Sequence, residues 1–412
     1  MQNTVIIITD RFPYGKSESF LETELMYYDK FDRVIIFPTF CGSKKREFKL
    51  PNLQIARPES AFFQNKIYAR LIACFKAIFT SFFWNEIMIL IKSRKFNIKR
   101  VIQLTSFLSK AKAIYAHIDK WLEKDNSDVS NYVFYSYWMS HQALGAIWLA
   151  QKYPNNRTIT RCHGFDLYER KDNNWYLPMR CYIAKYINQI CCISENGKQK
   201  LIYECLEIEE KIKVLRLGTD DFGLGPADCL RSSLKIVSCS WLAPLKRIGR
   251  VFDALELMED QSISWSHYGD GKQYKEMRLR AAAIAKKNIY IELKGAVSNS
   301  QILSDYSKIP YDVFVNVSDT EGIPVSIMEA ISFGIPVIAT DVGGTSEIVI
   351  DGHNGFLLHK DFHNNDLADL FLRIAHMPRT QYESMRRNAR AVWQEKCNAD
   401  VNFRSFVNSI SM

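Results

Sequence analysis

The sequence predicts an α/β protein made of two doubly wound, Rossmann-like domains. Its 412 residues exceed what one hydrophobic core usually organises, and its 47% hydrophobic content is enough for two cores. In both halves, short apolar segments alternate with helical sequence, as in parallel sheets covered by helices. A Gly- and Pro-rich stretch at 218–226 separates the two runs of alternation. We therefore place the domain boundary there.

The first domain is predicted to comprise residues 1–220, and the second residues 226–380. Apolar, β-branched and aromatic segments predict strands in the first domain at 5–9, 33–38, 133–138, 158–162 and 189–194. In the second domain they predict strands at 235–242, 262–271, 289–295, 312–318 and 335–341. A final helix is predicted at roughly 381–394. Ligands of doubly wound sheets bind at the carboxyl ends of the strands, so we expect a central cleft between the domains.

The net charge of +9 is concentrated in one part of the first domain. Residues 66–100 hold a single acid, Glu86, and eight basic residues: Lys66, Arg70, Lys76, Lys92, Arg94, Lys95, Lys99 and Arg100. The apolar stretch 77–91 between them is shorter than the roughly 20 residues that span a bilayer. This basic and aromatic helical region, 62–124, is expected to lie on an anionic membrane surface. The alternative is a pair of core helices with solvated basic faces.

The N-terminus and the cysteines indicate a cytoplasmic protein. MQNTVIIITD lacks the basic start and the cleavage site of a signal peptide, and it resembles a first strand. The ten cysteines are scattered without a CxxC pair, so neither a disulfide framework nor a zinc site is expected. No GxGxxG follows the first strand, which argues against a nicotinamide enzyme.

Two acids, Glu321 and Glu329, flank the start of a predicted helix in SDTEGIPVSIMEA. The helix is expected to run from about Pro324 to Phe333, with its first N–H groups available for phosphate or hydroxyl groups. Glu329 lies a turn and a half into the helix, so the two carboxylates are too far apart to share a proton but could hold two parts of one ligand. The alternative for Glu321 is an acid that only stabilises the helix N-terminus, and the alternative for Glu329 is a solvated side chain.

The stretch VNVSDTEGIPVSIMEAISFGIPVIATDVGGTSEIVIDGHNGFLL, residues 315–358, resembles the signature segment of retaining GT-B glycosyltransferases of the family-4 type. That family's hallmark is a Glu, seven residues and a second Glu, which Glu321 and Glu329 match. The resemblance implies that Glu321 contacts the donor sugar, that Glu329 contacts the ribose, and that Gly322, Ile323 and Pro324 lie near sugar and phosphates. It also implies a tail, 381–412, that crosses back to the first domain.

Further motifs extend the resemblance over most of the chain. SCSWLAPLKRIGR resembles a segment of the family whose Arg and Lys neutralise the donor diphosphate. Lys246 matches the family's lysine, whereas Trp241 stands where the arginine is usual. Arg247 is therefore the candidate second cation. HYGDG resembles a G-x-G turn, which makes Gly269 and Gly271 candidate donor-binding residues.

In the first domain, RCHGFD matches a station whose His lines the donor sugar, here His163. The first loop carries Gly15 and Lys16 where many members have two glycines near the phosphate. Glu18, Trp138 and Asp166 are weaker candidates for acceptor binding. A buried structural role is the alternative for the histidine and for the aromatic residue.

The resemblance implies a metal-independent, retaining hexosyltransferase that needs no cofactor and uses a nucleotide-diphosphate sugar as donor. Its acceptor would be a glycan or lipid-linked glycan in the synthesis of a bacterial capsule, O-antigen or exopolysaccharide. It would work in the cytoplasm, at the inner face of the membrane, without a nucleic-acid partner. A nucleotide-sugar epimerase of the same fold and a non-catalytic sugar-nucleotide-binding subunit are the alternatives.

Overall fold

A computed structural model of the chain contains two α/β units. It describes residues 3–15, 18, 20–42, 45–48, 50–57, 63, 66–125, 128–169, 176–228, 233–284 and 288–411. The first unit comprises Met1–Leu215 and Phe403–Met412, and the second comprises Arg216–Asn402. The chain therefore first passes from one unit to the other after residue 215, whereas the first domain was expected to end at residue 220. The expected tail, 381–412, divides between the two units at Asn402.

The first unit has a seven-stranded parallel sheet with the strand order β3-β2-β1-β4-β5-β6-β7. Its strands are β1 (Thr4–Thr9), β2 (Arg33–Pro38), β3 (Leu53–Ile55), β4 (Tyr132–Ser136), β5 (Arg157–Cys162), β6 (Gln189–Cys192) and β7 (Ile212–Val214). The five predicted strands are confirmed. The two short strands that the prediction missed, β3 and β7, form the edges of the sheet.

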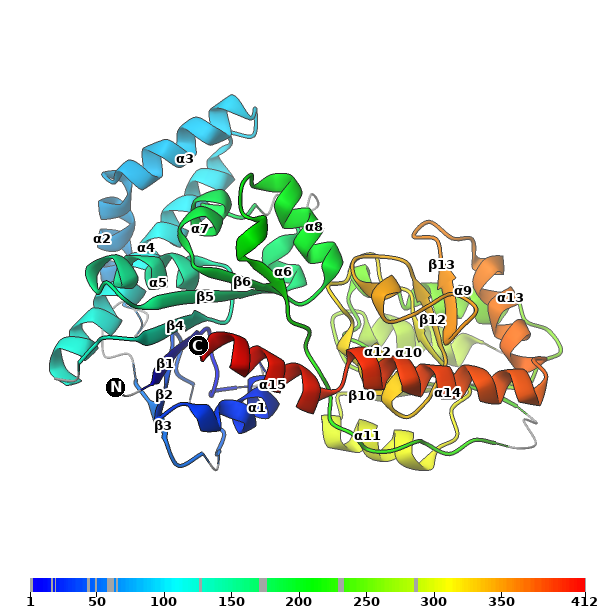
Figure 1. Ribbon diagram of the computed structural model, residues 1–412. Helices are drawn as coiled ribbons and strands as arrows, with labels where there is room; N and C mark the ends of the chain where they lie inside the picture. The colour runs from blue at the N-terminus through cyan, green and yellow to red at the C-terminus, as the bar shows by residue number, and fades with distance from the viewer. Residues whose placement is uncertain are drawn as a thin grey trace. The chain divides into compact units, whose positions relative to one another are not determined.

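Helices cover both faces of this sheet, because alternate residues of each strand point to opposite sides. Val5 and Ile7 pack on η1 and α15, whereas Ile6 and Ile8 pack on α4 and α5. The helices of the unit are α1 (Phe20–Glu24), η1 (Leu25–Lys30), α2 (Ile67–Ile78), α3 (Ser81–Lys92), α4 (Ile98–Asp125), α5 (His141–Lys152), α6 (Gly164–Leu167), α7 (Arg180–Tyr186), α8 (Glu195–Glu204), η2 (Glu209–Lys211) and α15 (Ala399–Ile410). Figure 1 shows α15 beside α1, and α2 and α3 at the periphery of this unit.

The second unit has a six-stranded parallel sheet with the order β10-β9-β8-β11-β12-β13. Its strands are β8 (Leu234–Cys239), β9 (Ile263–Tyr268), β10 (Ile289–Gly295), β11 (Val313–Asn316), β12 (Val337–Thr340) and β13 (Gly355–Leu358). Its helices are η3 (Pro244–Lys246), α9 (Gly249–Glu256), α10 (Tyr274–Ala283), α11 (Asn299–Lys308), α12 (Val325–Ser332), η4 (Thr345–Glu347), α13 (Asn364–Ala375) and α14 (Arg379–Lys396). The five predicted strands are again confirmed, and the unpredicted β13 is an edge. Both units thus have the doubly wound fold that the sequence predicts.

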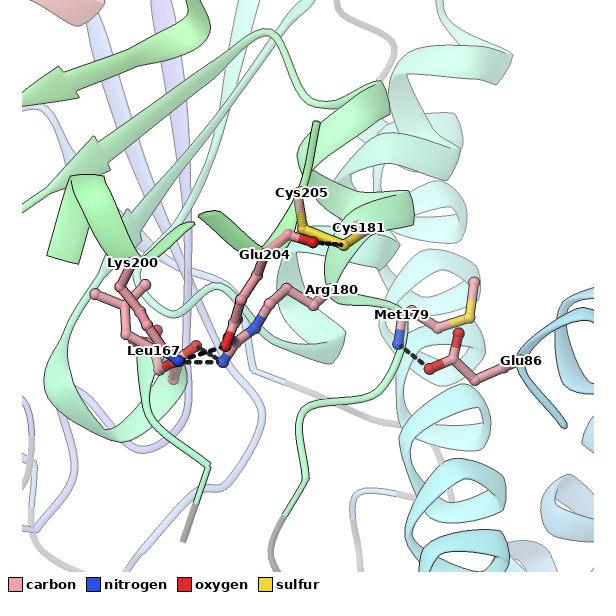
Figure 2. Close-up of a disulfide and its surroundings, with 9 residues drawn as sticks. Glu86, Leu167, Met179, Arg180, Cys181, Lys200, Glu204 and Cys205 are labelled. Carbon is pink, nitrogen blue, oxygen red and sulfur yellow. Dashed lines mark hydrogen bonds and ion pairs between the residues drawn. A yellow bond between two sulfur atoms is a disulfide. The ribbon is translucent and has the colours of Figure 1, made fainter. Parts of the chain in front are cut away.

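A disulfide between Cys181 and Cys205 corrects the expectation that the cysteines form no disulfide (Figure 2). Cys181 is on α7 and Cys205 follows the last residue of α8, so the bond joins the two helices. The sequence does not reveal this pair because the two cysteines lie 24 positions apart and folding alone brings them together. Arg180 reinforces the same junction through an ion pair with Glu204.

Among the described residues, no single helix is both long and apolar enough to cross a membrane. The pair α2 and α3, which bends by 68° at its junction, reaches the required length and composition only when its two helices are taken together.

Candidate active site

The central strands of the second unit carry the principal candidate residues. Its strand order reverses between β8 and β11, and the carboxyl end of such a switch point is where doubly wound sheets bind ligands. The segment after β8 supplies Lys246, the last residue of η3. The loop after β11 supplies Glu321. The fold therefore brings together two residues that are 75 positions apart in the sequence.

Lys246 and Glu321 form a partly buried ion pair. The Nζ atom of Lys246 lies 2.5 Å from Oε1 of Glu321, and the side chains are 21% and 11% exposed. The amide of Asn316, the last residue of β11, donates a hydrogen bond of 3.3 Å to the same oxygen. A lysine ammonium has three donors, so Lys246 can hold Glu321 and still bind an anionic group. This pairing keeps both charges at the carboxyl end of the sheet.

Glu329 is buried in α12, where it is 9% exposed. Its Oε1 accepts a hydrogen bond of 2.7 Å from Nδ2 of Asn299, the first residue of α11. Burial raises the pKa of Glu329 to about 7, and the bond from Asn299 opposes this shift. A carboxyl group with this pKa changes its charge near neutral pH, and its ionised form is an acceptor for paired hydroxyl groups.

Arg247, the candidate second cation, binds backbone carbonyl groups. Its guanidinium donates to the carbonyl oxygens of Val317 at 2.8 Å and Ser318 at 3.2 Å, and to that of Lys360 at 2.8 Å. The residue also has a left-handed backbone, with φ of 49°. The arginine therefore fastens the segment after β8 to the loop that begins after β11. Its role as a second cation for a diphosphate stays a prediction.

The glycines predicted near the donor permit close contacts between loops. A Cβ atom on Gly269 would lie 1.8 Å from the carbonyl oxygen of Ser240, and one on Gly271 would lie 2.4 Å from that of Leu242. The loops after β8 and β9 are joined by the hydrogen bond from Leu242 N to Asp270 O, which is 3.0 Å long. These glycines therefore let the β9 loop support the segment that leads to Lys246.

The loop from Glu321 to Pro324 offers backbone donors. The helix α12 begins at Val325, one residue later than predicted, with Pro324 as its N-cap. Among the described residues, the N–H groups of Gly322, Ile323 and Val325 have no protein acceptor. Such N–H groups at a helix N-terminus attract anions and polar hydroxyl groups. Gly344 N donates to Gly322 O at 2.6 Å and so fixes the loop from behind.

In the first unit, Glu18 organises the loop after β1. Its carboxylate accepts hydrogen bonds from the N–H groups of Asp10 and Arg11 at 2.8 Å and of Phe12 at 2.7 Å. Trp138 Nε1 adds a fourth, at 2.8 Å. The side chain is 7% exposed and these hydrogen bonds hold the loop, while its role in acceptor binding stays a prediction.

His163 follows β5 and is the buried polar side chain of this unit that lacks partners at both ring nitrogens. It is 8% exposed, and neither Nδ1 nor Nε2 has a hydrogen-bond partner among the described residues. Its ring packs against Tyr137 and Trp138, with centroids 4.7 and 4.5 Å away. Burial, aided by Arg161, lowers the pKa of His163 well below its usual value, so the imidazole is neutral. It can donate from one nitrogen and accept at the other.

Asp166 holds His163 in place. Its Oδ1 accepts from His163 N at 2.5 Å, and its Oδ2 accepts from Met139 N at 2.7 Å. The carboxylate thus ties the end of β5 to the loop after β4, and its burial raises its pKa to about 7. As with Glu18, the role of Asp166 in acceptor binding stays a prediction. For Trp138, the acceptor role stays a prediction.

The remaining predicted residues lie in the loop after β1. Gly15 has φ of 71°, and its carbonyl accepts a hydrogen bond from Arg46 Nε at 2.7 Å. Lys16 lies outside the described residues. Sequence reasoning missed Asn316 and Asn299. The first could have been found as a polar residue at the end of an apolar strand, whereas nothing in the sequence marks the second.

Comparison with known proteins shows relatives with a common activity. Residues 232–392 match the family model described as glycosyl transferases group 1. An uncharacterized glycosyltransferase of Methanocaldococcus jannaschii, MJ1178, is 36% identical over 132 residues, which are 32% of this chain and 35% of that protein. The putative colanic acid biosynthesis glycosyltransferase WcaL of Escherichia coli is 26% identical over 229 residues, 53% of this chain and 54% of that one. The chain thus spans about half or less of the length of these relatives.

Solved structures share the fold over nearly the whole chain. The lipopolysaccharide outer core galactosyltransferase WaaB superposes with a TM-score of 0.69 and 15% identity, over 99% of both chains. The Anabaena protein HepE, solved with UDP and glucose, gives a TM-score of 0.67 and 16% identity over 98% of this chain and 99% of that one. The architecture is therefore GT-B, and within it residues 232–392 of the second unit resemble the glycosyl transferases group 1 family.

Proposed function

We propose that the protein transfers a sugar from a nucleotide-diphosphate donor to an acceptor hydroxyl with retention at the anomeric carbon, without a bound metal. The observation that carries this proposal is the arrangement after β8 and β11, where Lys246 meets Glu321 beside the unpaired N–H groups of Gly322 and Ile323. A cation and free N–H groups suit a diphosphate, and a carboxylate suits the hydroxyl groups of a sugar.

Each side chain then has a defined task. Lys246 neutralises the negative charge that develops on the departing diphosphate, and Glu321 holds the donor sugar. Glu329 accepts hydrogen bonds from the ribose. The two unpartnered nitrogens of His163 make it a ligand for a sugar hydroxyl. The leaving diphosphate itself takes the acceptor's proton, so no side chain acts as general base.

The test is turnover of a panel of nucleotide sugars, beginning with UDP-glucose and UDP-N-acetylglucosamine because structural relatives were solved with UDP. We expect release of the nucleoside diphosphate, and we expect Lys246→Ala and Glu321→Gln to reduce that release. Full activity in both variants would refute the site. A changed sugar without release of nucleotide would identify an epimerase, and nucleotide binding without turnover would identify a non-catalytic subunit.

We further propose that the first unit docks on an anionic membrane and that the acceptor is lipid-linked. Exposed apolar side chains follow one face of α2, part of α3 and the start of α4. Ile67 is 74% exposed, Phe79 73% and Trp84 57%, and the others are Tyr68, Leu71, Ile72, Phe75, Met88, Ile89, Ile91, Phe96, Ile98 and Ile102. So many large exposed apolar side chains on consecutive helices are unusual for a soluble monomer and indicate an interaction surface.

The charges of this surface favour an anionic partner. Lys66, Arg70, Lys76, Lys92, Arg94, Lys95 and Lys99 are all exposed. The one acid of the segment, Glu86, is buried and accepts a hydrogen bond from Met179 N at 3.1 Å (Figure 2). Exposed apolar side chains that basic residues flank in the sequence, with the one carboxylate buried, are typical of interfacial helices. WcaL and the WaaB protein act, by their names, in colanic acid and lipopolysaccharide synthesis, and we place this chain in surface polysaccharide synthesis.

Vesicle flotation tests the membrane contact. We expect the protein to float with vesicles that contain phosphatidylglycerol and to remain below with phosphatidylcholine alone. The variant Lys92→Gln, Arg94→Gln, Lys99→Gln should lose this binding, whereas Lys95 is less suitable because it pairs with Glu169 at 3.5 Å. Binding that is independent of lipid charge, or unchanged in the triple variant, would contradict the proposal.

A further inference from the structure

The first unit contains a large cavity that the proposed reaction does not use. It lies between α2, α4 and α5 and has a volume of about 1160 Å³, slightly above the range for pockets that hold small molecules (roughly 300–1,000 Å³). Small residues open this space, because α2 presents Ala69, Ala73 and Ala77 to it and α4 presents Ala113 and Ala116.

The wall of the cavity is largely apolar and aromatic. Phe82, Leu108, Tyr115, Trp121 and Trp148 line it. Within the wall, Nε1 of Trp148 is buried and has no hydrogen-bond partner among the described residues. A buried indole N–H usually finds an acceptor, so this wall accommodates a hydrocarbon chain and offers one donor to a polar group.

The lining is also strongly basic. It includes Arg57, Lys76, Lys112, Lys120, Lys124 and Lys152, against a single acid, Asp125. Asp125 is already paired with Arg33 at 2.9 Å, and Lys152 pairs with Asp119 at 2.6 Å. Lys76, Lys112 and Lys120 have no carboxylate partner in the described part of the chain, and all three are exposed. The cavity therefore combines an apolar wall with cations that are free to bind an anion.

The position of the cavity separates it from the candidate active site. Trp121 and Lys124 lie at the end of α4, just before β4, and Lys152 is the last residue of α5, before β5. This end of the cavity lies at the amino edge of the sheet, whereas His163 follows the carboxyl end of β5. A molecule held there would not be positioned for reaction at His163. On α2, however, the lining residues adjoin the exposed Leu71, Phe75 and Phe79.

We propose that this cavity binds one anionic membrane lipid, with its phosphate on Lys76, Lys112 and Lys120 and an acyl chain along Trp121 and Trp148. The lipid is a resident ligand that anchors the first unit, distinct from the acceptor substrate. Charge complementarity and the adjoining apolar face of α2 point to a lipid of the membrane itself. The inference rests on the cavity and not on the proposed transferase activity.

Calorimetric titration with dodecyl phosphate, below its micelle concentration, tests the proposal. We expect saturable binding of one molecule per chain, at least tenfold tighter than dodecyl maltoside, which has the same chain without charge, and tighter than inorganic phosphate, which has the charge without the chain. The variant Lys76→Ser, Lys112→Ser should weaken binding by at least tenfold, because it removes two charge-assisted contacts to the phosphate. Ala73→Trp should narrow the cavity beside α2 and weaken binding.

The matched control is Lys110→Ser, an exposed lysine on α4 that does not line the cavity. It should bind dodecyl phosphate like the unchanged protein. Thermal unfolding verifies that every variant is folded. If Ala73→Trp does not fold, the lysine variants still test the proposal. Equal binding of the uncharged detergent, or undiminished binding by the double lysine variant, would overturn the proposal. If the unchanged protein binds dodecyl phosphate but turns over no nucleotide sugar, the proposed function is refuted and the lipid site is not.

Discussion

Nζ of Lys246 lies 2.5 Å from Oε1 of Glu321, and the pair joins the segment after β8 to the loop after β11. Removing one partner of a partly buried pair leaves the other uncompensated. Lys246→Ala should therefore lower kcat for release of nucleoside diphosphate by about 10²–10³-fold, the usual cost of one electrostatic donor to the transition state. Steady-state kinetics with a nucleotide sugar measure this loss.

The control for this experiment is Lys275→Ala, an exposed lysine on α10, which should keep full activity. The double variant Lys246→Ala, Glu321→Gln should lose much less than the product of the two single losses, because the two residues act as a unit. Strictly multiplicative losses would show that they act independently.

Arg247→Lys distinguishes positioning from diphosphate binding. Lysine cannot reproduce the planar fork that reaches three carbonyl oxygens, so we expect a loss of about 2 kcal/mol in the free energy of unfolding. Activity at 20 °C should fall far less than in Lys246→Ala. Unchanged stability together with a large rise in KM for the donor would restore the arginine to the diphosphate site.

Glu329 should make the stability of the second unit depend on pH. Its pKa is about 7 in the folded state and near 4.5 when unfolded, so the folded protein binds more protons between these values and its stability falls as pH rises through this window. A shift of this size corresponds to about 3 kcal/mol at pH 8. Glu329→Gln should therefore raise Tm at pH 8 by about 5 to 10 °C and leave it nearly unchanged at pH 4.5.

The same variant should weaken binding of the nucleotide, because an amide accepts fewer hydrogen bonds from a ribose than a carboxylate does. Differential scanning fluorimetry at several pH values, with and without UDP, measures both effects. A Tm that depends on pH equally in the variant and in the unchanged protein would show that another group is responsible.

Glu18→Ala should destabilise the first unit by about 3 kcal/mol, because three backbone N–H groups and the indole of Trp138 lose a charged acceptor. Glu22→Ala is the matched control. Glu22 lies nearby, its side chain is 47% exposed and it pairs with Arg46, so its removal should cost less than about 1 kcal/mol. If Glu18 binds the acceptor instead, its removal would raise KM for the acceptor and leave Tm unchanged.

The strands show where prediction from sequence succeeds and where it stops. All ten predicted strands are present, because central parallel strands are buried on both faces and need continuous apolar sequence, as in Val5–Ile8. The missed strands, β3, β7 and β13, are three or four residues long and lie at sheet edges. An edge strand pairs on one side only, so its sequence need not be apolar enough to stand out.

The residues of the candidate site likewise divide into those that the sequence indicates and those whose contacts only the fold reveals. The spacing of Glu321 and Glu329 around a helix start is a local feature that the sequence displays, and so are the strand ends that carry Lys246 and His163. The roles of Glu18, Asp166 and Arg247 depend instead on partners that only the folded chain supplies. Each of these side chains has a hydrogen-bond partner far away in the sequence, namely Trp138 for Glu18, Met139 for Asp166 and Lys360 for Arg247, which no spacing in the sequence can reveal.

By itself, the sequence determines that the chain forms two doubly wound sheets. It also determines which apolar segments become the central strands and which residues follow those strands. It also displays the basic and apolar composition of residues 66–100. Only the tertiary structure decides that Glu86 turns inward while the apolar faces of α2 and α3 remain exposed, and that Asn299 and Glu329 meet. The physical reason is that strand and helix periodicity are local properties, whereas burial and hydrogen-bond partnership arise between segments that only folding brings into contact.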